Sequence, residues 1–295
     1  MKIFTSINTR FFQPVFRKLT GWSDLQEQVD TMHFILDHCL DITQAPKATG
    51  ELRKTQLAAA EFLRIFHEIC VRHDIYYWLD YGTLLGAVRH GGFIPWDDDM
   101  DISMTLDDFY KADKILPCEL KKYGFEYCKR SNWEAVFSKW DAGIILDVFT
   151  IDSVNPEYAS NHNEVRKRLE IYNKYWLKHK KETFETINDA RHRIIGKEDN
   201  NGIWYHTAES DFDQTVFDNS TIFPLRQMKF EGYDFFIPNN YDIYLQEEFG
   251  NYMSFPKNGV LHHHGDGGNP IYMNAKRKGF DIDEFTVKIK KIHIT

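Results

Sequence analysis

Helical and strand-like patterns alternate between residues 51 and 151, and this alternation restricts the fold more than any other feature. From Glu51 to about His73, apolar side chains recur at helical spacing, which predicts a long amphipathic helix. A short apolar and aromatic run at 75–79 fits a buried strand. The later patterns are a strand, a helix and three strands, at 100–104, 107–122, 125–129, 135–140 and 144–151. The sequence therefore predicts an α/β core.

The remaining segments are less regular. Residues 25–40 predict a short helix, and a polar linker follows it at 43–50. Residues 157–190 are strongly charged with helical spacing, whereas 191–220 are polar and are expected to be irregular. Residues 228–255 indicate a hairpin followed by a helix, with Pro238 between the two.

Composition excludes several classes of function. Of 295 residues, 42% are hydrophobic, which is enough for a sizeable core. The chain has 44 acidic and 36 basic residues and a net charge of −8, so a dedicated nucleic-acid binder is not expected. No apolar stretch approaches the roughly 18–20 residues that span a bilayer, and no signal-peptide pattern follows the start. We therefore expect a cytoplasmic protein.

Two local features qualify this expectation. Residues 1–20 are basic and rich in phenylalanine, which is typical of a segment that lies on an anionic membrane surface. Pro14 interrupts any helix there, and the alternative is an arm packed on the main domain. The four cysteines form no C-x-x-C pair, so we expect reduced thiols and no zinc ribbon.

An acidic run carries the clearest chemical signal. Asp97, Asp99 and Asp101 alternate along the chain, so on a strand their side chains would leave from one face. Three carboxylates on one face repel one another unless a cation neutralises them, and all-oxygen ligation favours Mg²⁺ or Mn²⁺. The alternative is a solvated acidic turn, which does not explain the alternation with Met100 and Ile102.

Two further elements extend this site. Asp147 is a lone charge in the apolar strand 144–149, where a charge is costly unless it is paired or ligates a metal. It is therefore the candidate third carboxylate, and a buried salt bridge to Lys139 or to an arginine is the alternative. Gly82 and Thr83 follow a strand and open a helix, where backbone N–H groups can hold a phosphate.

The stretch 75–102 resembles the LicD family, whose relatives include the fukutin-related proteins. It contains GTLLGA at 82–87, RH at 89–90 and GFIPWDDDMDI at 92–102, which together match the family signature. The resemblance extends to FEG at 230–232, IP at 237–238, FG at 249–250 and FP at 255–256. It spans most of residues 51–256.

The resemblance implies a nucleotidyltransferase-type fold, a mixed sheet flanked by helices with additional helical segments. We accordingly expect a catalytic domain at 51–256 with a helical insertion at 157–190. An N-terminal arm and short helix would occupy 1–50, and a C-terminal extension at 257–295 would pack on the same domain.

The resemblance to the LicD family also implies metal-dependent transfer of a phospho-substituent, such as phosphocholine or a polyol phosphate. The donor would be CDP-choline or another CDP conjugate, and the acceptor a hydroxyl of a lipid-linked or surface glycan, such as lipopolysaccharide or capsule polysaccharide. Asp99 and Asp101 would bind Mg²⁺ or Mn²⁺, and Asp147 would ligate a second metal or take the acceptor proton.

The remaining motif residues would serve the donor. Gly82 and Thr83 would lie against its phosphates and Arg89 near the pyrophosphate, while Asp97 would orient a ligand or a water. Trp78, Tyr81 and Trp96 either stack on the donor or pack in the core. A metal site or a lid at His262–His264 is a weaker expectation, because adjacent histidines diverge in an extended chain.

Two other functions stay open at this point. One is a D-x-D glycosyltransferase that uses a nucleotide sugar, and the other is a catalytically silent module that binds a glycan or a nucleotide.

Overall fold

The computed structural model describes residues 22–131, 134–179, 181–207, 215–255, 272–273 and 279–294. The chain divides into two compact units, 1–44 with 253–260, and 45–252 with 261–295. The described part of the first unit holds helix α2 (Trp22–Cys39) and the 3₁₀ turn η1 (Ile42–Gln44). In the described ranges, every helix is too short or too polar to cross a membrane. The predictions for residues 1–20 and for His262–His264 lie outside the described residues.

The second unit is built on a mixed sheet. Its described strands are β1 (Trp78–Leu79), β2 (Met100–Thr105), β3 (Glu126–Lys129), β4 (Ala135–Lys139), β5 (Ile144–Val154), β6 (Ile203–His206) and β7 (Val216–Asp218). The order is β1-β2-β5-β4-β3, with β6 paired to β5 and β7 to β6. Strands β2 and β5 are parallel and the other pairs are antiparallel.

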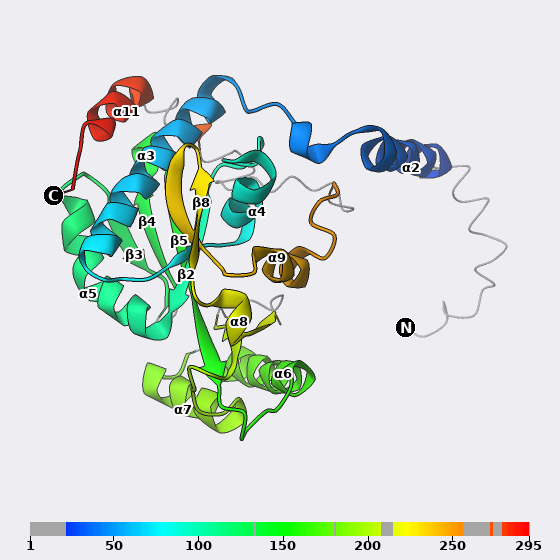
Figure 1. Ribbon diagram of the computed structural model, residues 1–295, viewed down its shortest axis with the longest axis vertical. Helices are drawn as coiled ribbons and strands as arrows, with labels where there is room; N and C mark the ends of the chain where they lie inside the picture. The colour runs from blue at the N-terminus through cyan, green and yellow to red at the C-terminus, as the bar shows by residue number, and fades with distance from the viewer. Residues whose placement is uncertain are drawn as a thin grey trace, which may run out of the picture. The chain divides into compact units, whose positions relative to one another are not determined.

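Helices surround this sheet (Figure 1). They are α3 (Gly50–Arg72), α4 (Tyr81–His90), α5 (Leu106–Lys121), α6 (His162–His179), α7 (Phe184–Ile194), α8 (Asn219–Ile222), α9 (Tyr241–Phe249) and α11 (Ile282–Lys290), with the 3₁₀ turn η2 (Trp140–Ala142). A separate hairpin joins β8 (Arg226–Phe230) to β9 (Tyr233–Ile237). Helix α3 packs on β5, α5 and α11, while α4 packs on β2.

The long strand β5 links two hydrophobic clusters. The larger cluster joins α3, α4, α5 and the central strands, and Phe62, Phe66 and Leu146 are fully buried in it. The smaller cluster surrounds Val154 at the other end of β5 and includes Val165 of α6. Figure 1 shows α6 and α7 at that far end of β5. Apolar packing at both ends of β5 therefore fixes the positions of the acidic residues that it carries.

The α/β class with a mixed sheet and flanking helices is confirmed, and so is the hairpin and helix within 228–255. The charged segment 157–190 is helical as expected, since it holds α6 and the start of α7. Two expectations are wrong. Strand β2 begins only at Met100, so Asp97 and Asp99 precede it instead of sharing its face. The described residues of 191–220 are not irregular throughout, because β6 and β7 extend the sheet there.

Candidate active site

Three predicted carboxylates converge at the parallel pair of strands. Asp101 of β2 lies directly opposite Asp147 of β5 in the register, and Asp99 comes from the loop that enters β2. Carboxylate oxygens of these three residues lie within 4.8 Å of one another. The convergence thus comes from strand pairing together with a loop, not from alternation along one strand.

The electrostatics of this cluster favour a bound cation. Asp99 and Asp147 are only 5% and 7% exposed. Burial raises the pKa of Asp101 well above its ordinary value, and the neighbouring charges of Asp99 and Asp147 raise it further. A divalent ion would relieve both the repulsion and the desolvation, and three oxygen ligands suit Mg²⁺ or Mn²⁺.

Asp147 also has a cationic neighbour. Arg130 Nη1 lies 2.9 Å from Asp147 Oδ1 and 2.8 Å from an oxygen of Glu134. The alternative of an arginine partner for Asp147 is therefore realised, whereas Lys139 lies 3.8 Å from Asp141 instead. Because the Arg130 side chain is 45% exposed and is shared between two acids, it leaves the three-carboxylate cluster undercompensated.

The acidic loop before β2 is not a solvated turn. Asp98 and Asp99 are buried, and they form with Asp97 a second group of carboxylates within 4.8 Å. The burial of Asp98 was not expected from the sequence, where it looked like part of an exposed turn. The loop therefore adds negative charge next to the Asp99–Asp101–Asp147 cluster.

The turn at Gly82 and Thr83 supports this loop and β2. Thr83 Oγ1 accepts a hydrogen bond of 2.8 Å from the backbone N–H of Asp101. A Cβ at position 82 would lie 2.8 Å from Asp97 Oδ2, so only glycine lets that carboxylate approach the start of α4. The turn and the acidic residues are thus in direct contact. Contact of the turn with donor phosphates stays a prediction.

Arg89 and His90 lie in the last turn of α4. Arg89 is 7% exposed, and its Nη1 donates a 3.0 Å hydrogen bond to the carbonyl of Tyr252. Burial lowers the pKa of Arg89 to about 10, and the charge of Asp97 acts in the opposite direction. Burial and the charge of Arg89 lower the pKa of His90 to about 4, so its imidazole is neutral at pH 7. A role for Arg89 at the pyrophosphate stays a prediction.

Comparison with known proteins identifies the family. Residues 74–189 match the family model described as LicD/FKTN/FKRP, nucleotidyltransferase domain. Residues 74–189 therefore form a nucleotidyltransferase domain of the LicD family. The matched range contains every predicted site residue, from Gly82 to Asp147.

Two relatives of this chain have names that describe transferases. It is 28% identical to the lipopolysaccharide cholinephosphotransferase LicD of Haemophilus influenzae, over 70% of this chain and 92% of that protein. It is 25% identical to the mouse ribitol 5-phosphate transferase FKRP, over 59% of this chain and 27% of that protein. An uncharacterized protein of Rickettsia prowazekii, RP689, is 44% identical over 22% of this chain and 24% of its own length. These relatives confirm the expected enzyme class, a LicD-type transferase.

The three aromatic candidates differ in how deeply they are buried. Trp78 is fully buried, and its Nε1 donates a 3.2 Å hydrogen bond to the hydroxyl of Tyr244, so it belongs to the core. Tyr81 and Trp96 are only partly buried. The Tyr81 ring packs against Phe149 and His206, with centroid distances of 5.0 and 5.2 Å.

Sequence reasoning missed a second cluster of metal-ligating side chains. Asp80, His206 and Glu248 bring one carboxylate or imidazole atom each to within 4.8 Å of the others. They are far apart in the sequence, and His206 lies in the segment that was expected to be irregular. No local spacing pattern signals such a cluster, because three separate elements build it.

Proposed function

We propose that this chain is a metal-dependent phosphotransferase that moves a phospho-substituent from a CDP-activated donor to a hydroxyl of a glycan. The convergence of Asp99, Asp101 and Asp147 beside the Gly82–Thr83 turn is the observation that carries the proposal. The names of the two characterised relatives support it, since one is a cholinephosphotransferase and the other a ribitol 5-phosphate transferase.

The donor set fits a divalent ion. Burial raises the pKa of Asp101, and the charges of the neighbouring carboxylates raise it further, so a cation at this position would be stabilising. Asp99, Asp101 and Asp147 would hold Mg²⁺ or Mn²⁺. When bound, the ion supplies charge stabilisation at the attacking and leaving oxygens of the phosphoryl transfer.

The protein residues then have separate tasks. The acceptor hydroxyl oxygen forms a bond to the phosphorus that carries the substituent, while the bond from that phosphorus to the pyrophosphate bridging oxygen breaks. CMP leaves, and a phosphodiester is formed. Asp147 either ligates a metal or takes the acceptor proton, and the N–H groups at the start of α4 approach the donor phosphates. Arg89 adds positive charge from the last turn of that helix.

The test is a thermal-shift panel of CDP-choline, CDP-glycerol, CDP-ribitol, UDP-glucose and GDP-mannose, each with and without Mg²⁺ or Mn²⁺. A ligand that binds the native state raises the unfolding temperature by mass action. We expect metal-dependent stabilisation by one CDP conjugate, and CMP release when a glycan acceptor is added. Stabilisation by UDP-glucose or GDP-mannose alone would indicate glycosyl transfer. No shift with any donor would favour a silent binding module.

The place of action is a further proposal. We propose that the chain works at the cytoplasmic side of a membrane, with residues 1–20 in contact with anionic lipid, where a lipid-linked glycan acceptor would be found. Sedimentation with vesicles of phosphatidylcholine and phosphatidylserine tests this: deletion of residues 2–20 should abolish binding to the anionic vesicles. Equal binding by the full and the shortened chain would contradict it.

A further inference from the structure

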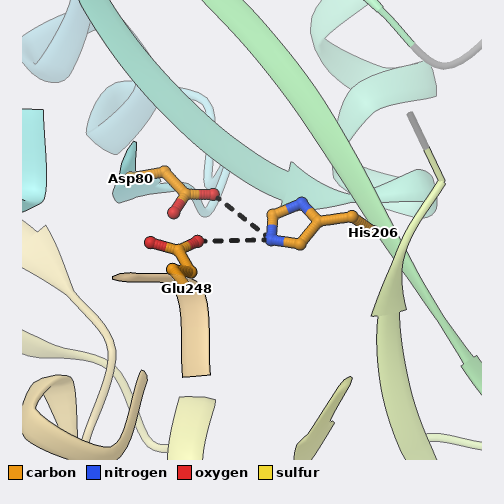
Figure 2. Close-up of side chains that lie close together, drawn as sticks. All are labelled: Asp80, His206 and Glu248. Carbon is orange, nitrogen blue, oxygen red and sulfur yellow. Dashed lines mark ion pairs between the residues drawn. The ribbon is translucent and has the colours of Figure 1, made fainter. Parts of the chain in front are cut away.

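Asp80, His206 and Glu248 are far apart in the sequence, but the fold brings their side chains together in the interior. Asp80 caps the N-terminus of α4, His206 ends β6, and Glu248 lies near the end of α9. Figure 2 shows the three side chains pointing toward one another, with the imidazole facing both carboxylates. The Nε2 atom of His206 is 3.8 Å from Asp80 Oδ2 and 3.5 Å from Glu248 Oε1.

The charge of this group is not balanced within it. The side chains of Asp80, His206 and Glu248 are 0%, 0% and 2% exposed. The group contains two acidic side chains and one basic side chain. A low-dielectric interior solvates carboxylates less well than water does, so a bound cation would offset part of the cost of burying them.

The other partners of Asp80 are neutral donors. Its carboxylate accepts hydrogen bonds from the backbone N–H of Tyr81 and from the hydroxyls of Ser103 and Tyr244. Within the described ranges of the chain, no lysine or arginine forms an ion pair with Asp80.

The spacing of the atoms also points to an ion. Hydrogen bonds between a ring nitrogen and a carboxylate are about 2.7–3.2 Å long, so 3.5 and 3.8 Å are too long for either pair. The hydrogen-bond partner of His206 Nε2 is the Tyr244 hydroxyl at 3.3 Å, a contact that a bound ion would replace. Ligands that lie about 2.0–2.2 Å from one ion at tetrahedral or octahedral angles are roughly 3.0–3.5 Å apart. A small inward movement of the three side chains would therefore bring three ligand atoms to coordination distance of one ion.

We propose that Asp80, His206 and Glu248 form a second divalent-cation site, separate from Asp99, Asp101 and Asp147. One imidazole nitrogen and two carboxylate oxygens suit a transition metal such as Zn²⁺ better than Mg²⁺. The ion would be structural, since it would join the start of α4 to β6 and α9. It would hold the turn at Tyr81, whose φ of 38° lies in the left-handed region.

The test measures zinc bound to the purified full-length chain, without reference to transferase activity. The protein is stripped with a chelator, incubated with ZnCl₂, desalted and analysed for metal content. The starting variant carries Asp101→Asn together with alanine at His262, His263 and His264, which removes the carboxylate site and the histidine run as competing ligands. We expect it to retain one zinc ion per chain, and we expect Glu248→Gln or His206→Gln in the same background to lose it.

X-ray absorption of the zinc-loaded starting variant decides the matter even if both added substitutions prevent folding. We expect one imidazole and otherwise oxygen ligands. Sulfur ligands would place the ion at a cysteine and overturn the proposal. Zinc retained equally in the Glu248→Gln and His206→Gln variants, or no tightly bound zinc at all, would also overturn it. In either of these cases the three residues form a buried polar cluster without a metal ion, and the proposed transferase function is unaffected.

Discussion

Strand β5 carries two buried acids in opposite electrical surroundings. Asp147 is 7% exposed, lies within 4.8 Å of the carboxylates of Asp99 and Asp101, and forms an ion pair with the half-exposed Arg130. Asp152 is 8% exposed and forms an ion pair with the buried guanidinium of Arg191. The same strand thus holds one carboxylate in a cluster of like charges and one that is paired with a buried cation.

The comparison separates an acid that stabilises the fold from one that serves a ligand. Burial by itself lowers the pKa of Arg191, but Tyr205 and Asp152 raise it overall, so the Arg191 guanidinium stays charged. At the other end, burial and like charges raise the pKa of Asp101. A charge that the fold compensates from its own residues needs no ligand, whereas a cluster of like charges persists only where an added cation relieves it.

Substitution in the cluster of Asp99, Asp101 and Asp147 should have the largest effect on turnover. Asp101→Asn or Asp99→Asn should lower the rate of CMP release about 100- to 10,000-fold, because metal stabilisation of the transferring phosphoryl group is worth several kcal/mol. The unfolding temperature of the metal-free protein should stay the same or rise, since a like charge is removed. Asp107→Asn, at an exposed position of α5, is the matched control. Near-normal turnover in both variants would disprove the metal assignment.

Substitution of Asp152 should have the opposite effect, a loss of stability with little change in turnover. Asp152→Asn leaves the Arg191 guanidinium buried without its counter-charge, which should lower the free energy of unfolding by about 3–5 kcal/mol. Turnover of the folded fraction at 25 °C should stay close to wild type. Urea denaturation measures the loss. In the double variant Asp152→Leu, Arg191→Met much of it should be recovered, and a single variant as stable as wild type would show that the pair does not stabilise the fold.

Local patterns predicted most elements of the sheet and the helices around it. Apolar periodicity is a local property, so α3, α5 and the hairpin β8–β9 could be located from the sequence. The segment 191–220 was misjudged because β6 has four residues and β7 three, too few for a clear alternation.

The sequence predicted those site residues whose charge is unusual for their local sequence. A lone aspartate in an apolar strand indicated Asp147, and the acidic run indicated Asp99 and Asp101. Their contact depends on the parallel register of β2 and β5, which no local pattern contains. The cluster of Asp80, His206 and Glu248 was unpredictable for the same reason, since its members come from three elements.

The link between α4 and the acidic cluster offers a smaller and sharper test. Thr83→Val removes the hydroxyl that accepts the hydrogen bond from the Asp101 N–H and leaves that partly buried donor without its acceptor. The expected loss in the free energy of unfolding is about 1–3 kcal/mol, with reduced metal affinity because Asp101 is displaced. Thr83→Ser keeps the hydroxyl and should retain the metal affinity. Calorimetric titration with Mn²⁺ compares the two, and equal affinities would show that Thr83 does not position Asp101.

Glu231 is a third buried acid, and it is paired with cationic side chains beside the loop that follows α4. Its side chain is 4% exposed, and it accepts hydrogen bonds of 2.8 and 2.7 Å from Arg53 and of 3.3 Å from the backbone N–H of Phe93. Burial by itself raises the pKa of Glu231, but Arg53 and Lys47 lower it below the ordinary value of 4.5.

Because the folded-state pKa is the lower one, the unfolded chain binds the proton first as the pH falls. The contribution of Glu231 is therefore complete above pH 4.5 and is lost as the pH falls through the folded-state pKa. At pH 7, Glu231→Gln should lower the free energy of unfolding by roughly 1.5–3 kcal/mol, and the difference from wild type should disappear in acid. Asp234→Asn removes an exposed acid on the same hairpin, where its partner Lys229 is also exposed, and should change little. If the Glu231→Gln deficit, measured by urea denaturation from pH 7 down to pH 3, did not depend on pH, the loss would come from packing. Charge compensation would then not be what distinguishes Glu231 from the acids around Asp101.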